Sequence, residues 1–253
     1  IRNCLVGSEM CIRDRLGFEN IDQFIDQVIP EDIQLKDKSS EILPKGCSEI
    51  EALNELEEIA KKNTKMRSLI GLGYYDNHMP KVIQRHVLEN PRWYTSYTPY
   101  QAEIAQGRLE ALFNFQTIVC ELTGFPVANA SLLDEGTAAA EAMAMSFSAR
   151  KNKSSKVYLV ESNVFDHTFN VLQTRAKPLG ISLKRFTQSN LPNHDDVFGM
   201  LLQLPGKNGE LYDPTFLISQ AHRSEIIVTA CIDPLAQVLI KPISEFGVDV
   251  AVG

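Results

Sequence analysis

The sequence lacks features that would place it at a membrane or on nucleic acid. No apolar run approaches the roughly 18 residues of a spanning helix, because charged residues interrupt the longest candidates every few positions. Lysine and arginine are scattered along the chain and the formal net charge is −7, so no basic face is formed for nucleic acid or anionic lipid. These absences predict a soluble protein that binds neither.

Cysteine is scarce and irregularly placed. The five cysteines are widely spaced, and they include no CxxC pair and no histidine cluster at metal-ligand spacing. Disulfide frameworks and zinc sites depend on such pairing, so we expect a reduced intracellular protein without a bound metal. The 253 residues, 44% of them hydrophobic, are enough for one large domain or two small ones.

The start of the chain has no recognisable targeting signal. It begins at Ile1, and IRNCLVGSEMCIRDR has neither the apolar core of a secretory signal nor a clear amphipathic transit pattern. We interpret residues 1–15 as a non-native or disordered leader. At the other end VDVAVG reads as a buried strand, and we expect the sequence to be a piece of a longer protein.

Residues 16–125 have the periodicity of helices. Apolar residues recur at helical spacing from Gly17 to about Lys62, and a second helix is expected from near Pro80 to Asn90. The longest helix is expected over about Ala102–Thr123, with Gly124 as its C-terminal cap. We expect this helix to be central, with Gly107 inside it allowing another backbone to approach closely.

Residues 126–253 alternate between strand-like and helix-like segments. A helix rich in small residues follows SLLDEGT, and the β-rich runs after it are KVYLVES, ISLKRF, FGMLLQL, EIIVTACID and VDVAVG. Runs such as IIVTACI lack polar alternation, which is typical of parallel strands covered on both faces. The fold class predicted is therefore α/β, preceded by a helical N-terminal segment.

Two long stretches carry a family resemblance. WYTSYTPYQAEIAQGRLEALFNFQTIVCELTG and VANASLLDEGTAAAEA resemble the N-terminal half of the glycine decarboxylase P-protein family of the glycine cleavage system. MRSLIGLGYYD, QTRAKPLGI and EFGVDVAVG add to the likeness, which runs from about Leu16 to Gly253. Two long matches together are far more specific than one short motif.

The resemblance implies a fold and an activity. The fold is that of a pyridoxal-phosphate-dependent transferase, the aspartate-aminotransferase-like fold type I, here as an incomplete large domain. The family decarboxylates glycine on pyridoxal 5'-phosphate and transfers the aminomethyl group to the lipoyl arm of the H-protein. The cofactor supplies the electron sink, and the protein supplies position and electrostatics.

The resemblance also implies partners. Two homologous halves, fused or on separate subunits, build the enzyme as a homodimer or heterotetramer, and the cofactor lysine lies in the C-terminal half. The fragment alone is then expected to be inactive, in a bacterial cytoplasm rather than a mitochondrion. Two other readings stay open. One is a non-catalytic structural or regulatory subunit, and the other is an aminotransferase or cysteine desulfurase, which the two long matches disfavour.

The turn before the small-residue helix has two interpretations. Gly136 and Thr137 at a helix N-terminus offer free N–H groups to a cofactor phosphate. Asp134 and Glu135 would repel a phosphate and are themselves good partners for helix-start amides. We favour a self-capped helix start, so that Gly136 and Thr137 are a remnant and unoccupied cofactor site. In the family, the cofactor-bearing half has an uncharged polar turn at the matching place.

Asp233 follows a buried strand, where this fold places an aspartate beside the pyridine nitrogen of the cofactor. Lys241 lies too close behind it to be the cofactor lysine. We interpret Asp233 either as a remnant of a cofactor site or as a helix cap before Pro234. His167 is expected to be a surface or helix-start residue.

The segment YTPYQAE has the strongest functional interpretation. Tyr97, Thr98 and Tyr100 place two phenols and a hydroxyl on a segment stiffened by proline, ahead of a long helix. Such a segment can reach a neighbouring active site and contribute catalytic groups. The alternative is that the tyrosines pack in the core with their hydroxyls bonded locally.

Overall fold

The computed structural model describes residues 15–34, 45–69, 71–94, 98, 101, 103, 106–189, 192 and 196–253. The chain forms two compact units, Ile1–Arg67 and Ser68–Gly253. This division comes earlier in the chain than the boundary expected near residue 125, which stays a prediction.

The described part of the first unit contains two capped helices, α2 (Ile21–Val28) and α3 (Glu49–Lys61). The side chain of Asn20 accepts a hydrogen bond from the Gln23 amide at the start of α2. Ser48 and Glu51 form a reciprocal capping box at the start of α3. The helices predicted from spacing are confirmed, and neither contains a buried residue.

The second unit begins with helices that precede the sheet. They are α4 (Lys81–Leu88), α5 (Pro91–Tyr94) and α6 (Arg108–Thr123). Pro80 precedes α4, as the sequence predicts. Gly124 ends α6 in the left-handed region at φ 75°, and its amide donates to the Cys120 carbonyl at 2.8 Å. The predicted C-terminal cap is confirmed.

Two expectations about α6 are wrong. The helix begins at Arg108, so Gly107 precedes it, and among the described residues no atom lies within 4 Å of where a Gly107 side chain would start. No described backbone therefore approaches Gly107 closely. Only Thr123 of α6 is buried, whereas Phe113 is 67% exposed and Ile118 is 55% exposed. Its apolar periodicity is real, but in this unit α6 lies at the surface and is not central.

A five-stranded parallel sheet forms the centre of the second unit, in the order β2-β1-β3-β4-β5. Every β-rich run in the sequence contributes a strand. The strands are β1 (Val157–Glu161), β2 (Ser182–Phe186), β3 (Val197–Leu204), β4 (Ile227–Ile232) and β5 (Val250–Val252). The remaining elements are α7 (Glu135–Ala149), α8 (Asp166–Leu179), α9 (Thr215–Arg223), α10 (Pro234–Gln237) and a 3-10 helix (Ile243–Phe246).

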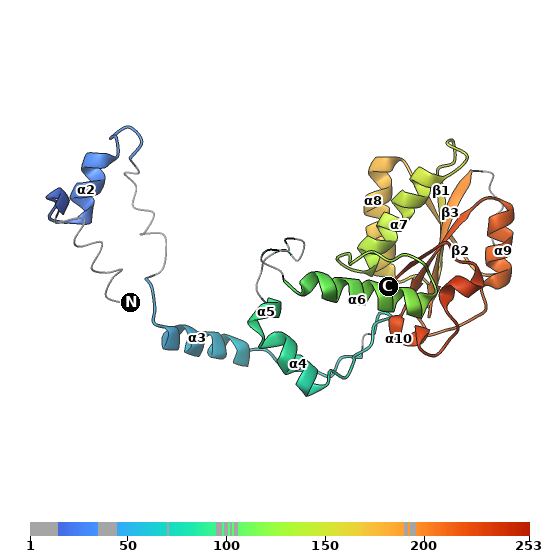
Figure 1. Ribbon diagram of the computed structural model, residues 1–253, viewed down its shortest axis with the longest axis horizontal. Helices are drawn as coiled ribbons and strands as arrows, with labels where there is room; N and C mark the ends of the chain where they lie inside the picture. Colours follow the sequence, from blue (N-terminus) through green and yellow to red (C-terminus); the bar gives the residue numbers. More distant parts are fainter. Residues whose placement is uncertain are drawn as a thin grey trace. The chain divides into compact units, whose positions relative to one another are not determined.

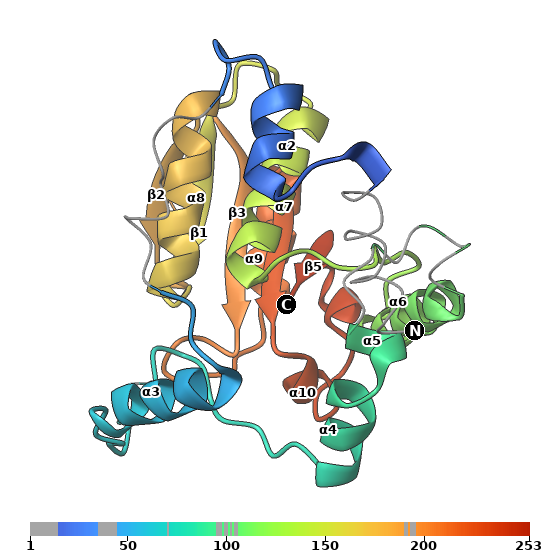
Figure 2. The same ribbon diagram turned by 90° about the vertical axis from the view of Figure 1, so that its left-hand side faces the viewer.

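Helices cover both faces of the sheet, so the unit has three layers (Figures 1 and 2). On one face α7 and α8 pack on Tyr158 and Val160 of β1. On the other face α9 packs on the core that contains Val157 and Leu159. Alternate residues of one strand thus enter opposite cores. All eight residues of β3 are buried, and each large apolar side chain contributes about 1.5–3 kcal/mol.

In the described part of the chain, no helix combines the length and apolarity needed to cross a membrane.

Candidate functional site at the carboxyl end of the sheet

Several polar residues of the second unit lie at the carboxyl ends of β1 and β3. From β1 the chain passes to β2 on one side, and β3 then lies on the other side of β1. Open α/β sheets bind ligands at such a switch point, outside the carboxyl ends of the strands. Glu161 ends β1, Gln203 lies near the end of β3, and α7 begins beside them at Glu135.

Asp134 caps α7 with its own side chain. Its extended backbone, at φ −159°, lets Oδ1 accept a hydrogen bond from the Thr137 amide at 2.7 Å. This bond lowers the pKa of Asp134. The helix start is therefore self-capped, and the Thr137 amide already donates its hydrogen bond to the Asp134 carboxylate.

Glu135 ties the start of α7 to α8. The Thr168 hydroxyl donates to Glu135 Oε1 at 3.0 Å, across 33 positions of sequence. Burial raises the pKa of Glu135, and hydrogen bonds from Thr168 and Gln203 oppose that shift. A carboxyl with a raised pKa can hold or release a proton more readily near neutral pH than an exposed one.

Tyr74 and His167 form a contact that the sequence did not reveal. Tyr74 Oη lies 3.1 Å from both ring nitrogens of His167, and its ring packs edge-on against Phe165 at 4.9 Å between centroids. Burial, followed by the charge of Glu135, raises the pKa of Tyr74 to about 12. His167 is exposed near the start of α8, as expected, but its ring also has this partner.

Glu161 is a second feature that sequence reasoning missed. Its side chain is 1% exposed, yet both carboxylate oxygens are satisfied. Oε1 accepts from Gln188 Nε2 at 2.9 Å, and Oε2 accepts from the Gln203 amide at 3.0 Å. The only signal in the sequence was a glutamate at the end of an apolar run. These hydrogen bonds lie at the switch point between β1 and β3.

Asp233 follows β4 and caps α10. Its carboxylate is exposed, and Oδ1 accepts from the Leu235 amide at 2.8 Å. The cap before Pro234, one of the two interpretations of this residue, is present in the structure. The ammonium of Lys241 lies over the Phe246 ring at 4.1 Å from its centroid. A cofactor role for Asp233 stays a prediction.

The YTPYQAE segment is only partly visible. Tyr97 and Tyr100 lie outside the described residues, and Thr98 is exposed. Their contribution to an active site stays a prediction. Among the candidate site residues that the structure describes, Gly136 and Thr137 lie together, as neighbours in the first turn of α7. Gly136 lies close to His167 and Val171, because a Cβ built on Gly136 would be 3.5 Å from His167 Nε2.

Comparison with known proteins identifies the family. The sequence model of the glycine cleavage system P-protein family matches residues 8–253, which is nearly the whole chain. The chain belongs to the glycine cleavage system P-protein family. The match extends into residues 8–15, part of the segment interpreted as a leader.

Two curated relatives of this chain are cyanobacterial and much longer than it. It is 56% identical over 245 residues to glycine dehydrogenase (decarboxylating) of Prochlorococcus marinus strain NATL1A, which covers 97% of this chain and 25% of the relative. It is 50% identical over 238 residues to the Nostoc punctiforme protein of that name, covering 94% and 24%. The chain thus spans about a quarter of the length of these curated relatives.

A solved P-protein structure shows the same fold. A crystal structure of glycine decarboxylase (P-protein) of the glycine cleavage system, in inhibitor-bound form, matches with a TM-score of 0.77 at 28% identity. The match covers 95% of this chain and 55% of the solved chain. The α/β fold with a parallel sheet, predicted from the sequence, is confirmed.

The first turn of α7 does not fit the phosphate of pyridoxal 5'-phosphate, the cofactor that the family resemblance implies. The Thr137 amide that a phosphate would need is bonded to Asp134, and Glu135 lies beside it. Two carboxylates next to a phosphate dianion are repulsive. Asp233 is engaged by the Leu235 amide. In the described residues, no three histidine, cysteine, aspartate or glutamate side chains are grouped to hold a metal ion either.

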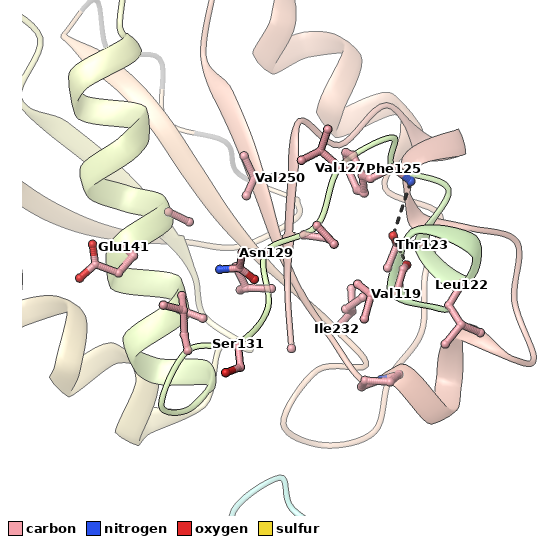
Figure 3. A pocket seen from close by; sticks show the side chains of 18 of the residues that line it. Val119, Leu122, Thr123, Phe125, Val127, Asn129, Ser131, Glu141, Ile232 and Val250 are labelled. Atoms are coloured by element: carbon pink, nitrogen blue, oxygen red, sulfur yellow. Dashed lines mark hydrogen bonds between the residues drawn. The ribbon is translucent and has the colours of Figure 1, made fainter. Parts of the chain in front are cut away.

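A separate apolar groove lies between α6, α7 and β5 (Figure 3). Its volume is about 960 Å³, and α6 contributes Phe115, Ile118 and Leu122 to its wall. Val127, Asn129 and Ser131 of the segment before α7 line it together with Val250 of β5. The groove includes residues of β5, which pairs with β4 alone within the described residues.

Proposed function

We propose that this chain is a part of glycine decarboxylase, the P-protein of the glycine cleavage system. The observation that carries the proposal is the 56% identity over 97% of this chain to relatives named glycine dehydrogenase (decarboxylating). The complete enzyme would release carbon dioxide from glycine and pass the aminomethyl group to the lipoyl arm of the H-protein. The cyanobacterial relatives favour a bacterial cytoplasm over a mitochondrion.

In this proposal pyridoxal 5'-phosphate is held by the part of the protein that this chain does not span. The supporting observation is the acidic first turn of α7, where Asp134 occupies the Thr137 amide. When bound there, the cofactor would supply the electron sink for decarboxylation. This chain would shape the rim of the active site and the contacts between halves, as a homodimer or heterotetramer, and would be inactive alone.

The proposal is tested by carbon dioxide release from carboxyl-labelled glycine in the presence of lipoylated H-protein. We expect no release by the 253-residue chain, and release by the longer protein that contains it. A longer protein that releases none would favour the alternative, a non-catalytic structural or regulatory subunit. Incubation with pyridoxal phosphate and borohydride is a second test. A reduced adduct on Lys241 would contradict the proposal that the cofactor is held by the part of the protein outside this chain.

A further inference from the structure

Gly73 allows the segment GLGYYD, residues 71–76, to contact the start of α8. Gly73 has φ +95°, a conformation that side chains rarely adopt. A Cβ built there would overlap the Phe165 ring, at 2.6 Å from Cδ1 and 2.8 Å from Cζ. Phe165 itself is 7% exposed, so its ring has little room to move away. Only glycine fits at this approach.

Tyr74 extends the contact to α8 and the sheet end. Its ring meets Phe165 at an interplanar angle of 62° and His167 at 46°, with centroids 4.9 and 5.3 Å apart. Its hydroxyl bonds the His167 ring, and the tautomer of His167 decides which group donates. One residue therefore makes two ring contacts and one hydrogen bond at the same place.

The first turn of α7 acts on the same residue. Beyond the effect of burial, the charges of Glu135 and Asp134 raise the pKa of the Tyr74 phenol, and the Thr168 hydroxyl, one position after His167, donates to Glu135. These residues lie at the carboxyl end of β1, the edge where an open α/β sheet receives ligands. In this chain Tyr74, His167 and Glu135 make hydrogen bonds at that edge, and the Glu161 carboxylate accepts from Gln188 and Gln203 there.

We propose that residues 71–76 form a fixed cover over the carboxyl end of β1, anchored by Gly73 and Tyr74. The Tyr74 ring takes the place that a ligand would occupy in an open sheet of this kind. The cover rests on the proposed function, because a covered carboxyl end of β1 is consistent with a cofactor held by the rest of the protein. The cover is nevertheless tested without any enzymatic activity.

Hydrogen exchange measured by mass spectrometry on the purified chain tests the cover. We expect Gly73→Ala and Tyr74→Ala to speed exchange of residues 71–76 and of the start of α8 by tenfold or more. The matched controls are Gly71→Ala, where the nearest atom is 3.8 Å away, and Tyr75→Ala, whose side chain is 70% exposed. The controls should leave the rates unchanged. Unprotected exchange of 71–76 in the wild type, or none of the expected acceleration, would overturn the cover.

The His167 ring nitrogens give a signature that general loosening would not produce. Tyr74→Phe keeps the ring packing but removes the hydroxyl, so the nitrogen-15 resonances of His167 should shift, whereas Tyr75→Phe should leave them in place. Assignment comes from their loss in His167→Gln. Unchanged His167 resonances in Tyr74→Phe would remove the hydrogen bond from the proposal and so contradict it.

Pyridoxal phosphate itself is the last probe. A fixed cover predicts that adding it leaves exchange of 71–76 and of the first turn of α7 unchanged in the wild-type chain. Protection of either segment by the compound would overturn the cover. Neither result depends on glycine decarboxylation, so failure of the cover and failure of the proposed function can be told apart.

Discussion

Adjacent carboxylates at the start of α7 respond to their surroundings in opposite directions. Asp134 is exposed, and its bond from the Thr137 amide lowers its pKa below the ordinary 3.8. Glu135 is partly buried, and burial raises its pKa above the ordinary 4.5. Ionised Asp134 therefore stabilises the fold, whereas ionised Glu135 opposes it.

Glu135→Gln should raise the stability of the chain at neutral and higher pH. The folded pKa of Glu135 lies above its unfolded value, so the free energy of unfolding falls as pH rises from the unfolded value through the folded one. Glutamine keeps the acceptor for Thr168 and removes this loss. We expect Tm at pH 8 to rise by about 2–4 °C, and the gain to vanish near pH 4.

Thermal unfolding followed by circular dichroism at the two pH values measures the effect. Glu121→Gln, on an exposed position of α6, is the matched control and should change Tm little at either pH. A Glu135→Gln protein that melts lower than the wild type at pH 8 would show that the ionised carboxylate is needed for folding.

Local residue contacts could be predicted, and distant ones could not. The Asp134 cap spans three positions and follows from the residue types alone. The Tyr74–His167 contact joins residues 93 positions apart, and nothing in either local pattern links them. The contacts of Glu161 could not be predicted for the same reason, because its partners Gln188 and Gln203 come from other segments of the chain.

At the scale of elements, the cap of α7 should be measurable. Asp134→Ala leaves the Thr137 amide without its acceptor, and we expect Tm at pH 7 to fall by about 2–4 °C. The stabilisation by Asp134 is present above its unfolded pKa and is lost as pH falls through the lower folded value. The difference between variant and wild type should therefore shrink in acid.

Asp134→Asn is the control for this cap, since asparagine keeps an acceptor oxygen while removing the charge. It should retain most of the wild-type Tm at pH 7. An equal loss in Asp134→Asn and Asp134→Ala would mean that the charge beside the helix start, and not the hydrogen bond, supplies the stability.

Strands were more predictable than helix ends. The five β-rich runs became five strands because continuous apolar sequence is what a doubly covered parallel sheet requires. The start of α6 was misplaced because apolar periodicity continues through Gly107, whereas the backbone there is left-handed at φ 81°. A periodic pattern shows that a helix exists, but the conformation of one residue decides where it begins.

At the scale of the whole chain, the sequence indicated the α/β class but not the surface that the chain leaves open. The groove between α6, α7 and β5 depends on side chains from distant segments, which no local pattern brings together. Phe115 is 50% exposed, Val127 is 80% exposed and Met145 is 52% exposed along it. A contiguous apolar surface beside a free strand edge favours self-association.

The chain should therefore associate through this groove, and a charge placed in it should suppress the association. Val127→Lys is suitable, because the side chain is 80% exposed and its replacement disturbs no core. Lysine beside an open strand edge is also how natural sheets prevent edge pairing. Light scattering against concentration measures the effect, and Leu239→Lys, at a similarly exposed apolar position outside the groove, is the control. We expect Val127→Lys to scatter several-fold less than the wild type and Leu239→Lys to resemble it. If both lysines reduce scattering equally, net charge and not the groove governs association, and if neither does, the chain associates through another surface.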